Sequence, residues 1–406
     1  MTRSPFAIYD KAAPAGVPSV DLDPFSIAYF DDPYPGQARM RDAGPFIWLE
    51  QYGIGAVARH DYVRQALTDW QTFCSSRGVG MADFEVHGRF RLRSLILEAD
   101  PPEHDVARRA LSKVMSPPVL RTLRAHFEAT AETMVDALLE RGCFDGVADL
   151  ARAYPLSVFP DAVGMRKEGR EKLLSHADAL FNSFGPQNEL FQASRAQAEF
   201  EWINEQGRRE NLSSNGLGMM IHEAADRGEI DPEDAPMLVR AMLQAGLDTT
   251  INSLSAALHA MATHPAEWIK LRADPSLAKN AFEEAIRFES PVQTFFRTAT
   301  RDTELGGVPI AEGDKILMFL GAANRDPRQW KDPDRYDISR KLIGHVGFGA
   351  GIHACVGQLL AKMEGELVLS ALARRAKVLR LTGEPRRHYN NTLRSFASLP
   401  LEIVAA

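Results

Sequence analysis

A glycine-rich run near the end of this 406-residue chain limits what it can fold into more than any other feature. The run precedes a helical pattern that begins near Gln358, and it reads Phe348-Gly349-Ala350-Gly351-Ile352-His353-Ala354-Cys355-Val356-Gly357. Glycines at this density permit positive φ angles and let the backbone approach a flat ligand closely. The N-terminus of the next helix lowers the pKa of a nearby thiol. We therefore expect a thiolate at Cys355, although a lone cysteine is more often an inert buried side chain.

The number and spacing of the cysteines and histidines argue against a structural zinc site and against disulfides. A structural zinc site needs four ligands with paired cysteines, and only His345 and His353 lie near Cys355. Cys74 and Cys143 are far away in the sequence and give no disulfide framework. This usage suits a reducing compartment. Because we find no signal peptide and no apolar stretch of ~20 residues, we expect a cytoplasmic protein that does not enter a membrane.

The composition is that of a globular protein, with 45% apolar and 25% charged residues. A formal net charge of -7 argues against nucleic-acid binding, because phosphate recognition needs a concentrated basic surface. The sequence has no repeat or Gly/Ser linker. We expect a monomer with one domain over residues 1–406 and an irregular arm at residues 1–23.

Apolar residues recur with helical spacing along most of the chain, so the predicted fold class is mainly α with small β-sheets. The helical patterns cover residues 129–139, 173–184, 237–261 and 357–373. Strand patterns predict hairpins within residues 45–57 and 308–319 and a last strand at 399–404.

The longest predicted helix has unusual residues in its middle. It begins at Asp231-Pro232 and stops at His264-Pro265, well above the mean helix length of about 11–12 residues. Its centre reads Ala245-Gly246-Leu247-Asp248-Thr249-Thr250. Glycine and threonine are poor helix formers, so local propensity is overridden here, as is typical of functional sites.

Four motifs together resemble those of the cytochrome P450 family. The pattern Phe-Gly-x-Gly-x-His-x-Cys-x-Gly at residues 348–357 is complete and resembles the haem-binding signature of that family. Residues 245–250 resemble its oxygen-activating segment, residues 284–287 its Glu-x-x-Arg helix, and residues 333–336 the segment that completes the associated ion-pair network. The resemblance spans the chain. It implies a triangular prism in which haem b lies between the long oxygen-binding helix and the helix of the cysteine loop.

The resemblance also implies roles for individual residues. Cys355 ligates the haem iron, Thr249 donates a hydrogen bond to bound dioxygen, and Asp248 relays protons from solvent. The alternative for the latter pair is a helix-bending threonine beside a capping or surface aspartate. The other implied haem contacts are His104, Arg108, Ala245, Gly246, Arg297, Phe348, Gly349, His353, Val356 and Gly357, of which His104, Arg108, Arg297 and His353 are the candidates for the propionates.

Glu284 and Arg287 lie three residues apart on one predicted helix face. On their own they would be a surface pair contributing about 0.2–0.5 kcal/mol. The resemblance implies instead a buried structural triad with Arg335 behind the cysteine loop.

Electrons have to come from other proteins, because no Gly-x-Gly-x-x-Gly fingerprint follows a predicted strand and no flavin module is present. The resemblance implies an iron-sulfur ferredoxin and its NADH-dependent reductase. Arg108, Arg109 and Lys113 are candidates for a basic patch that meets an acidic ferredoxin, although such charges are more often merely solvated.

Longer stretches resemble one branch of the family, the enzymes that oxidise para-substituted benzoic acids, with 4-methoxybenzoate O-demethylation as the type activity. These stretches are residues 73–80, 94–100, 184–190 and 289–297. The implied ring contacts are Leu97, Phe181, Phe184, Val292 and Phe295, and the implied contacts of the carboxylate are Arg91, Ser94 and Gln244. Ala241 and Gln244 stand where that branch has small hydroxyl residues; Gln244 can still donate a hydrogen bond, but Ala241 cannot. Without the resemblance, the two phenylalanines of residues 181–184 would be ordinary core residues.

Three alternatives remain open. The substrate could be another small hydrophobic molecule, such as a terpene or a different aromatic. A haem sensor would need the cysteine loop but neither Asp248 and Thr249 nor an electron donor. A peroxide-driven peroxygenase would have an altered residue at position 249.

Overall fold

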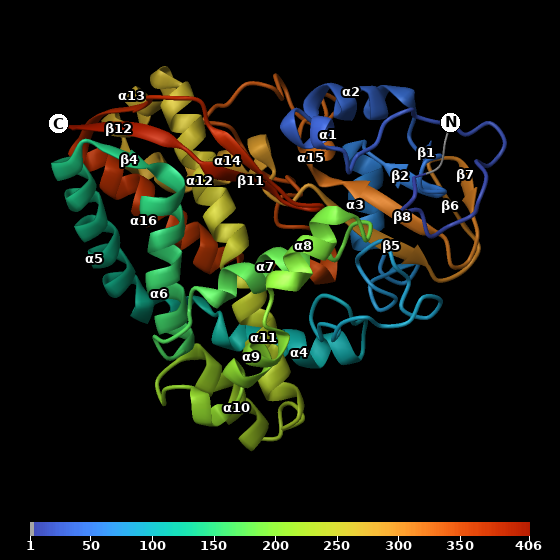
Figure 1. The fold of residues 1–406 in the computed structure, drawn as a ribbon, viewed down its shortest axis with the longest axis horizontal. Coiled ribbons are helices and arrows are strands. Elements are labelled where there is room, and N and C mark those ends of the chain that lie inside the picture. The colour runs from blue at the N-terminus through green and yellow to red at the C-terminus, as the bar shows by residue number, and fades with distance from the viewer. Residues whose placement is uncertain (1–3) are drawn as a thin grey trace.

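The computed structural model describes residues 4–406, and its arrangement is shown in Figure 1. Helices occupy most of the molecule. The largest sheet lies at the end that holds the N-terminus, and the C-terminal strand lies at the opposite end. The predicted class, mainly α with small β-sheets, is confirmed.

The helices have the following bounds. They are α1 Ile27–Asp31, α2 Tyr34–Ala43, α3 His60–Thr68, α4 Glu103–Val114, α5 Pro117–Arg141, η1 Gly146–Arg152, α6 Ala153–Val163, α7 Lys172–Asn182, α8 Glu189–Gln197, α9 Phe200–Gln206, η2 Arg209–Asn211, α10 Leu217–Asp226, α11 Asp234–Gly246, α12 Asp248–Thr263, α13 Pro265–Ala273, η3 Pro275–Leu277, α14 Ala278–Glu289, α15 Leu320–Asn324, η4 Gly351–His353 and α16 Gln358–Arg375. The patterns predicted at 129–139, 173–184 and 357–373 correspond to α5, α7 and α16.

The strands form four sheets. They are β1 Ile47–Leu49, β2 Ile54–Val57, β3 Phe73–Cys74, β4 Cys143–Asp145, β5 Thr294–Ala299, β6 Thr303–Leu305, β7 Val308–Ile310, β8 Lys315–Phe319, β9 Ala376–Leu381, β10 Arg386–Tyr389, β11 Arg394–Ser398 and β12 Pro400–Ala405. The five-stranded sheet has the order β1-β2-β8-β5-β3, and the three-stranded sheet has the order β4-β12-β9. The two pairs β6-β7 and β10-β11 complete the set.

One predicted hairpin is confirmed and the other is wrong. Strands β1 and β2 pair antiparallel, with Trp48 opposite Gly55. Strand β7 instead pairs with β6, while β8 enters the large sheet between β2 and β5. Every residue of β8 is buried, so this strand needs a partner on both edges to satisfy its backbone groups.

The long central helix is in fact two helices. α11 ends at Gly246 and α12 begins at Asp248, with Leu247 between them at φ -93° and ψ -65°. The hydroxyls of Thr249 and Thr250 donate to the carbonyls of Ala245 and Gly246, at 2.9 and 3.1 Å. Such bonds back to the preceding turn compete with the regular helical ladder. The prediction of one continuous helix is therefore wrong at the segment where propensity was poorest.

The helices around the cysteine loop form the main core. α16 packs against α5 and α14, and α14 packs against α12. Leu254, Ala257, Leu258 and Met261 of α12 are fully buried or nearly so. Packing on several sides fixes the start of α16, and with it the loop that carries Cys355.

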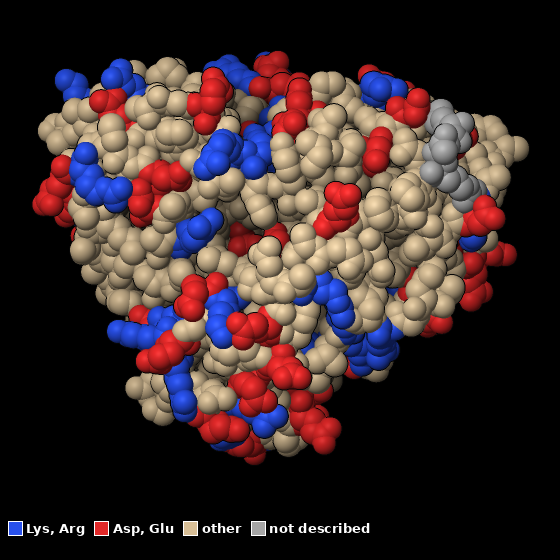
Figure 2. Space-filling model, viewed as in Figure 1, with Lys and Arg blue, Asp and Glu red and all other residues tan. Residues whose placement is uncertain are grey.

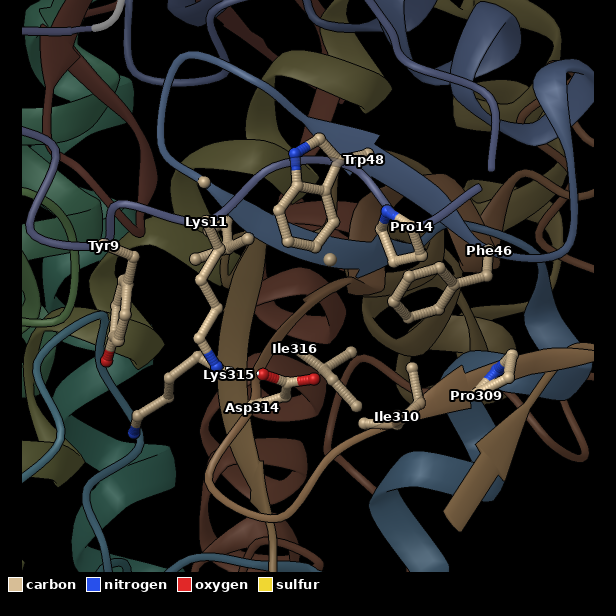
Figure 3. A pocket seen from close by; sticks show the side chains of 13 residues that line it. Tyr9, Lys11, Pro14, Phe46, Trp48, Pro309, Ile310, Asp314, Lys315 and Ile316 are labelled. Atoms are coloured by element: carbon tan, nitrogen blue, oxygen red, sulfur yellow. Dashed lines mark hydrogen bonds and ion pairs between the residues drawn. The ribbon is translucent and has the colours of Figure 1, made fainter. Parts of the chain in front are cut away.

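The N-terminal arm is irregular over residues 4–23, which hold no helix or strand and a single bridge from Ser19 to Trp48. Residues 1–3 of the predicted arm lie outside the described residues. Figure 3 shows a cavity between this arm and the large sheet, where Lys11 forms an ion pair with Asp314. Its volume of about 10 Å³ is the space of one water, and none of the predicted site residues lines it.

Charged side chains of both signs are interspersed over the face in Figure 2, which also shows a recess near its centre with acidic side chains inside. In Figure 1 the same position lies by α7 and α12.

Candidate active site

The cysteine loop has the backbone that its glycines predict. Gly349 and Gly351 have φ angles of 72° and 69°, in the left-handed region that favours glycine. The Cys355 N–H donates to the Phe348 carbonyl at 2.8 Å and closes the loop. The Cys355 side chain keeps exposed surface, as does Ala245 on the core helix α11. Residues 348–357 are all at least partly exposed, and Ala245 is exposed on a helix whose residues 238–243 are buried, so these surfaces leave room for a flat ligand.

Although Cys355 keeps some exposed surface, the protein atoms packed around its sulfur desolvate it and raise the pKa of the thiol, which differs from the predicted lowering. The N–H groups of Gly357 and Gln358 and the guanidinium of Arg108 oppose this rise. The predicted helix N-terminus therefore acts in the expected direction, but desolvation outweighs it. A bound metal ion deprotonates a coordinating thiol outright, so the loop suits a thiolate ligand more than a free nucleophile.

Four of the predicted propionate contacts gather around the loop and one carboxylate. The rings of His104 and His353 lie 4.5 Å apart, and His104 Nε2 is buried without a hydrogen-bond partner. Arg297 is 3% exposed and donates to the Phe296 carbonyl. Arg108 donates to the Ala354 carbonyl.

Asp100 is the carboxylate in this group, and sequence reasoning missed its role. Burial raises its pKa, but hydrogen bonds from His353 and from the N–H groups of Ser75 and Ser76 lower that pKa to about 2. Burial lowers the pKa of Arg297 to about 10. Arg297 acts on Asp100 electrostatically, His104 lies beside His353, and Arg108 lies at the loop, so the group retains donor capacity for added carboxylates. This donor set fits the two propionates of a haem.

Glu284 and Arg287 form the predicted buried pair, but Arg335 is not its third member. Both side chains are fully buried, and the Arg287 guanidinium donates twice to Glu284, at 2.7 and 2.8 Å. The third cation is Arg340, whose Nε donates to Glu284 at 3.0 Å. Arg335 has an exposed side chain and contributes its carbonyl, which accepts from Arg287 and Arg340.

This network is connected to the cysteine loop through Asn324. The Asn324 carbonyl accepts from Arg287 at 2.8 Å, and its side-chain oxygen accepts from the Val346 N–H at 2.8 Å. A buried ion pair thus holds the residues that lead into the loop.

All five predicted ring contacts belong to one small apolar cluster, separate from the main core. Phe181 and Phe184 lie edge-to-face at 5.6 Å, and Phe184 is 5.7 Å from Phe295. Leu97 and Val292 pack against these rings, together with Val79 and Leu393.

Arg91 lies beside this cluster, but its charge is already paired. Its guanidinium carbon is 5.0 Å from the Phe184 ring centroid. It donates from both terminal nitrogens to Glu98, a residue with a fully buried side chain. Ser94 caps this turn, with its hydroxyl accepting from the Leu97 N–H at 3.2 Å. The charge of Arg91 is therefore already paired, whereas the Ser94 hydroxyl, which accepts here, still has its own O–H to donate.

Arg240 is the functional candidate that sequence reasoning missed. It is 6% exposed and donates to Asn204 Oδ1 at 3.1 Å and to the Arg93 carbonyl at 3.2 Å. Its Nε is buried without a partner, and no described carboxylate lies in ion-pair contact with it. Burial lowers its pKa, the nearby Arg91 acts in the same direction, and Glu98 opposes both. Two guanidinium groups and one carboxylate leave one buried positive charge.

The signal for Arg240 was available in the sequence. It directly precedes Ala241 on the helix that carries Gln244 and Ala245, one turn before the predicted oxygen-activating segment. Among residues 240–245 of α11, Arg240 is the one charged residue. Ala241 is buried and Gln244 is partly buried.

The predicted basic patch is smaller than expected. Arg108 is turned inward to the loop, and Lys113 pairs with Glu229 at 2.9 Å, which leaves Arg109 exposed. An open hollow of about 410 Å³ adjoins the loop at Phe348, Gly349 and Ala354. Among the described residues, none of the helices has the length and apolar character needed to cross a membrane.

Comparisons with known proteins agree with this geometry. The family model described as Cytochrome P450 matches residues 155–404. Cytochrome P450 CYP199A2 of Rhodopseudomonas palustris is 56% identical over 395 residues, covering 97% of this chain and 96% of that protein. Cytochrome P450 107B1 of Saccharopolyspora erythraea is 30% identical and covers 94% of this chain and 97% of its own.

Solved structures give the same fold. Cytochrome P450 CREJ in complex with (4-ethylphenyl) dihydrogen phosphate superimposes with a TM-score of 0.84 at 24% identity, covering 94% of this chain and 99% of that one. CYP108D1 from Novosphingobium aromaticivorans gives 0.81 at 29% identity, covering 93% and 96%. This chain belongs to the cytochrome P450 family and is a haem-binding monooxygenase.

Proposed function

We propose that the protein oxidises para-substituted benzoic acids, with the O-demethylation of 4-methoxybenzoate to 4-hydroxybenzoate and formaldehyde as its representative reaction. The observation that carries this proposal is the uncompensated charge of Arg240, which acts on Arg91, the neighbour of Phe184 in the aromatic cluster. A buried cation costs free energy unless an anion pairs with it. An aromatic carboxylate supplies both the ring for the apolar cluster and the charge for Arg240.

Bound haem supplies the oxygen-activating chemistry, and we assign its thiolate ligand to Cys355. His104, Arg108, Arg297 and His353 hold its propionates through the donor capacity around Asp100. Phe348, Gly349, Val356 and Gly357 of the loop and Ala245 of α11, which all keep exposed surface, would contact the haem. Gly246 has a packing reason of its own, because a Cβ there would lie 2.4 Å from Phe159.

The chain's own residues then orient the substrate and supply protons. Arg240 holds the carboxylate, Phe184 and its neighbours hold the ring, and the para substituent is left to project toward the haem. Asp248 gives up a proton taken from solvent, and the Thr249 hydroxyl, which donates to the Ala245 carbonyl, reorients to pass it on. Hydroxylation of the methoxy carbon gives a hemiacetal that collapses to the phenol and formaldehyde.

We propose a separate ferredoxin with an NADH-dependent reductase as the electron donor. The exposed Arg109 and the hollow beside Phe348 and Gly349 are the candidate surface for such a partner, because the neighbouring Arg108 bonds to Ala354 and the loop itself lines the hollow.

The test is a spectral titration of the purified holoprotein with 4-methoxybenzoate and with the neutral 4-methoxybenzamide. We expect the acid to move the Soret band to the high-spin position. Arg240→Gln should weaken binding of the acid by roughly 10- to 100-fold, the range of a lost charged hydrogen bond, and should change binding of the amide much less. Arg208→Gln, which removes a surface arginine paired with Glu205, is the matched control.

Two results would contradict the proposal. Equal losses of affinity for the acid and the amide in Arg240→Gln would show that the charge of Arg240 does not bind the carboxylate. A shift with neutral terpenes and none with benzoates would favour the neutral-substrate alternative, which the pairing of Arg91 with Glu98 supports.

A further inference from the structure

Asp248 opens α12, and three charged or titratable side chains from other elements act on it. Asp178 comes from α7, His388 from β10, and Arg152 from η1. None of these was singled out in the sequence, where they are far from Asp248 and from each other.

Asp178 lies on α7, which packs against α12, and it forms an ion pair with His388. His388 Nε2 lies 2.8 Å from Asp178 Oδ1, and the two side chains are 50% and 23% exposed. The amide groups of Asn390 and Asn182 also donate to Asp178, at 2.9 and 3.2 Å. The carboxylate is therefore held in place, while the imidazole reaches water. The recess with acidic side chains in Figure 2 lies by α7 and α12.

The two members of the pair shift the pKa of Asp248 in opposite directions. Burial is the largest cause that raises the pKa of Asp248, to about 7, and Asp178 adds to that rise. His388 and Arg152 lower it. The hydrogen bond with Asp178 in turn raises the pKa of His388, and the protonated imidazole offsets the charge of Asp178.

We propose that Asp178 and His388 are positioning residues that set the protonation state of Asp248 and thereby make proton delivery follow the pH of the solvent. The proposal rests on the proton role of Asp248 in the proposed function. Water protonates His388, whose Nε2–H donates to Asp178 Oδ1. When His388 loses that proton, the charge of Asp178 is no longer offset, it repels a second carboxylate, and Asp248 retains its proton.

The two single variants should therefore have opposite effects. His388→Asn leaves Asp178 uncompensated and should raise the pH at which Asp248 ionises. Asp178→Asn removes the repulsion and should lower that pH. A single charge at short range moves such a midpoint by about one pH unit. His388→Arg keeps a cation beside Asp178 at every pH, so the pH at which Asp248 ionises should stay low.

Two measurements on the holoprotein test this. Infrared titration follows the protonated carboxyl stretch of Asp248, assigned by its loss in Asp248→Asn, and needs no turnover. The second measurement is the pH profile of the fraction of NADH electrons that appear in product instead of peroxide. His126→Asn, which removes an exposed histidine near Asp161, is the matched control and should leave both unchanged.

The outcomes separate this inference from the proposed function. The inference is supported if His388→Asn and Asp178→Asn shift the pH at which Asp248 ionises in opposite directions and the pH profile of the product fraction shifts in the same way. Shifts that are absent or in the same direction, with Asp248→Asn still impaired, overturn the role of the pair alone. Opposite infrared shifts with product fractions that do not change, even in Asp248→Asn, overturn the proton role of Asp248 itself.

Discussion

The buried carboxyl group of Glu364 should make the stability of the protein depend on pH. It lies on α16, its side chain is fully buried, and neither carboxyl oxygen has a hydrogen-bond partner. Burial raises its pKa from 4.5 to about 8. Since one pKa unit corresponds to ~1.4 kcal/mol, ionising Glu364 costs the folded state about 5 kcal/mol relative to the unfolded chain.

The sign of the pH effect follows from the raised pKa. The folded protein keeps the Glu364 proton that the unfolded chain releases above pH 4.5, so stability falls as pH rises and levels off above about pH 8. Glu364→Gln, which stays neutral, should lose this dependence. For 406 residues, an unfolding entropy of ~2 cal/mol/K per residue converts 1 kcal/mol to roughly 1 °C in Tm.

The assay is the melting temperature of the holoprotein between roughly pH 5.5 and pH 8.5. The Tm of Glu364→Gln relative to the unaltered protein should rise by about 4 °C over this interval, from the pKa difference above. Glu366→Gln on the same helix removes a partly exposed partner of Arg124 and should show no such slope. Parallel curves for Glu364→Gln and the unaltered protein would refute the claim that this carboxyl is buried and neutral.

Two further predictions concern the cysteine-loop support and the oxygen site. Arg287→Ala should destabilise the protein by about 3–5 kcal/mol by leaving Glu284 buried with Arg340 as its one cationic partner, whereas Arg335→Ala should cost less than about 1 kcal/mol, because only its carbonyl is used. Thermal melts of both variants check this, and a severe loss in Arg335→Ala would contradict the assignment of Arg340. Thr249→Ala should still consume NADH but release most electrons as peroxide, which a paired assay of peroxide and product measures; fully coupled turnover would show that the hydroxyl is dispensable.

The sequence was most informative where the relevant residues are neighbours in the chain. The glycines at 349 and 351 predicted the left-handed turns of the cysteine loop, and helical periodicity predicted α5, α7 and α16. These features depend on local conformation and on which face of a helix is apolar.

Some local features were predicted wrongly because tertiary contacts, or side-chain hydrogen bonds to the backbone, compete with the local pattern. Strand β8 joined the large sheet instead of its sequence neighbour, since a fully buried strand needs two edges paired. The central helix broke at Leu247, where two threonine hydroxyls bond back to the preceding turn.

The sequence by itself determined the conformation of the loop that holds Cys355 and the mainly helical class. It also placed Asp248 and Thr249 next to each other in the chain. Only the tertiary structure decided which charges meet: Arg340 with Glu284, Glu98 with Arg91, and His388 with Asp178. The physical reason is that an ion pair forms within about 4 Å, and the path of the loops, not spacing in the chain, sets which side chains come that close.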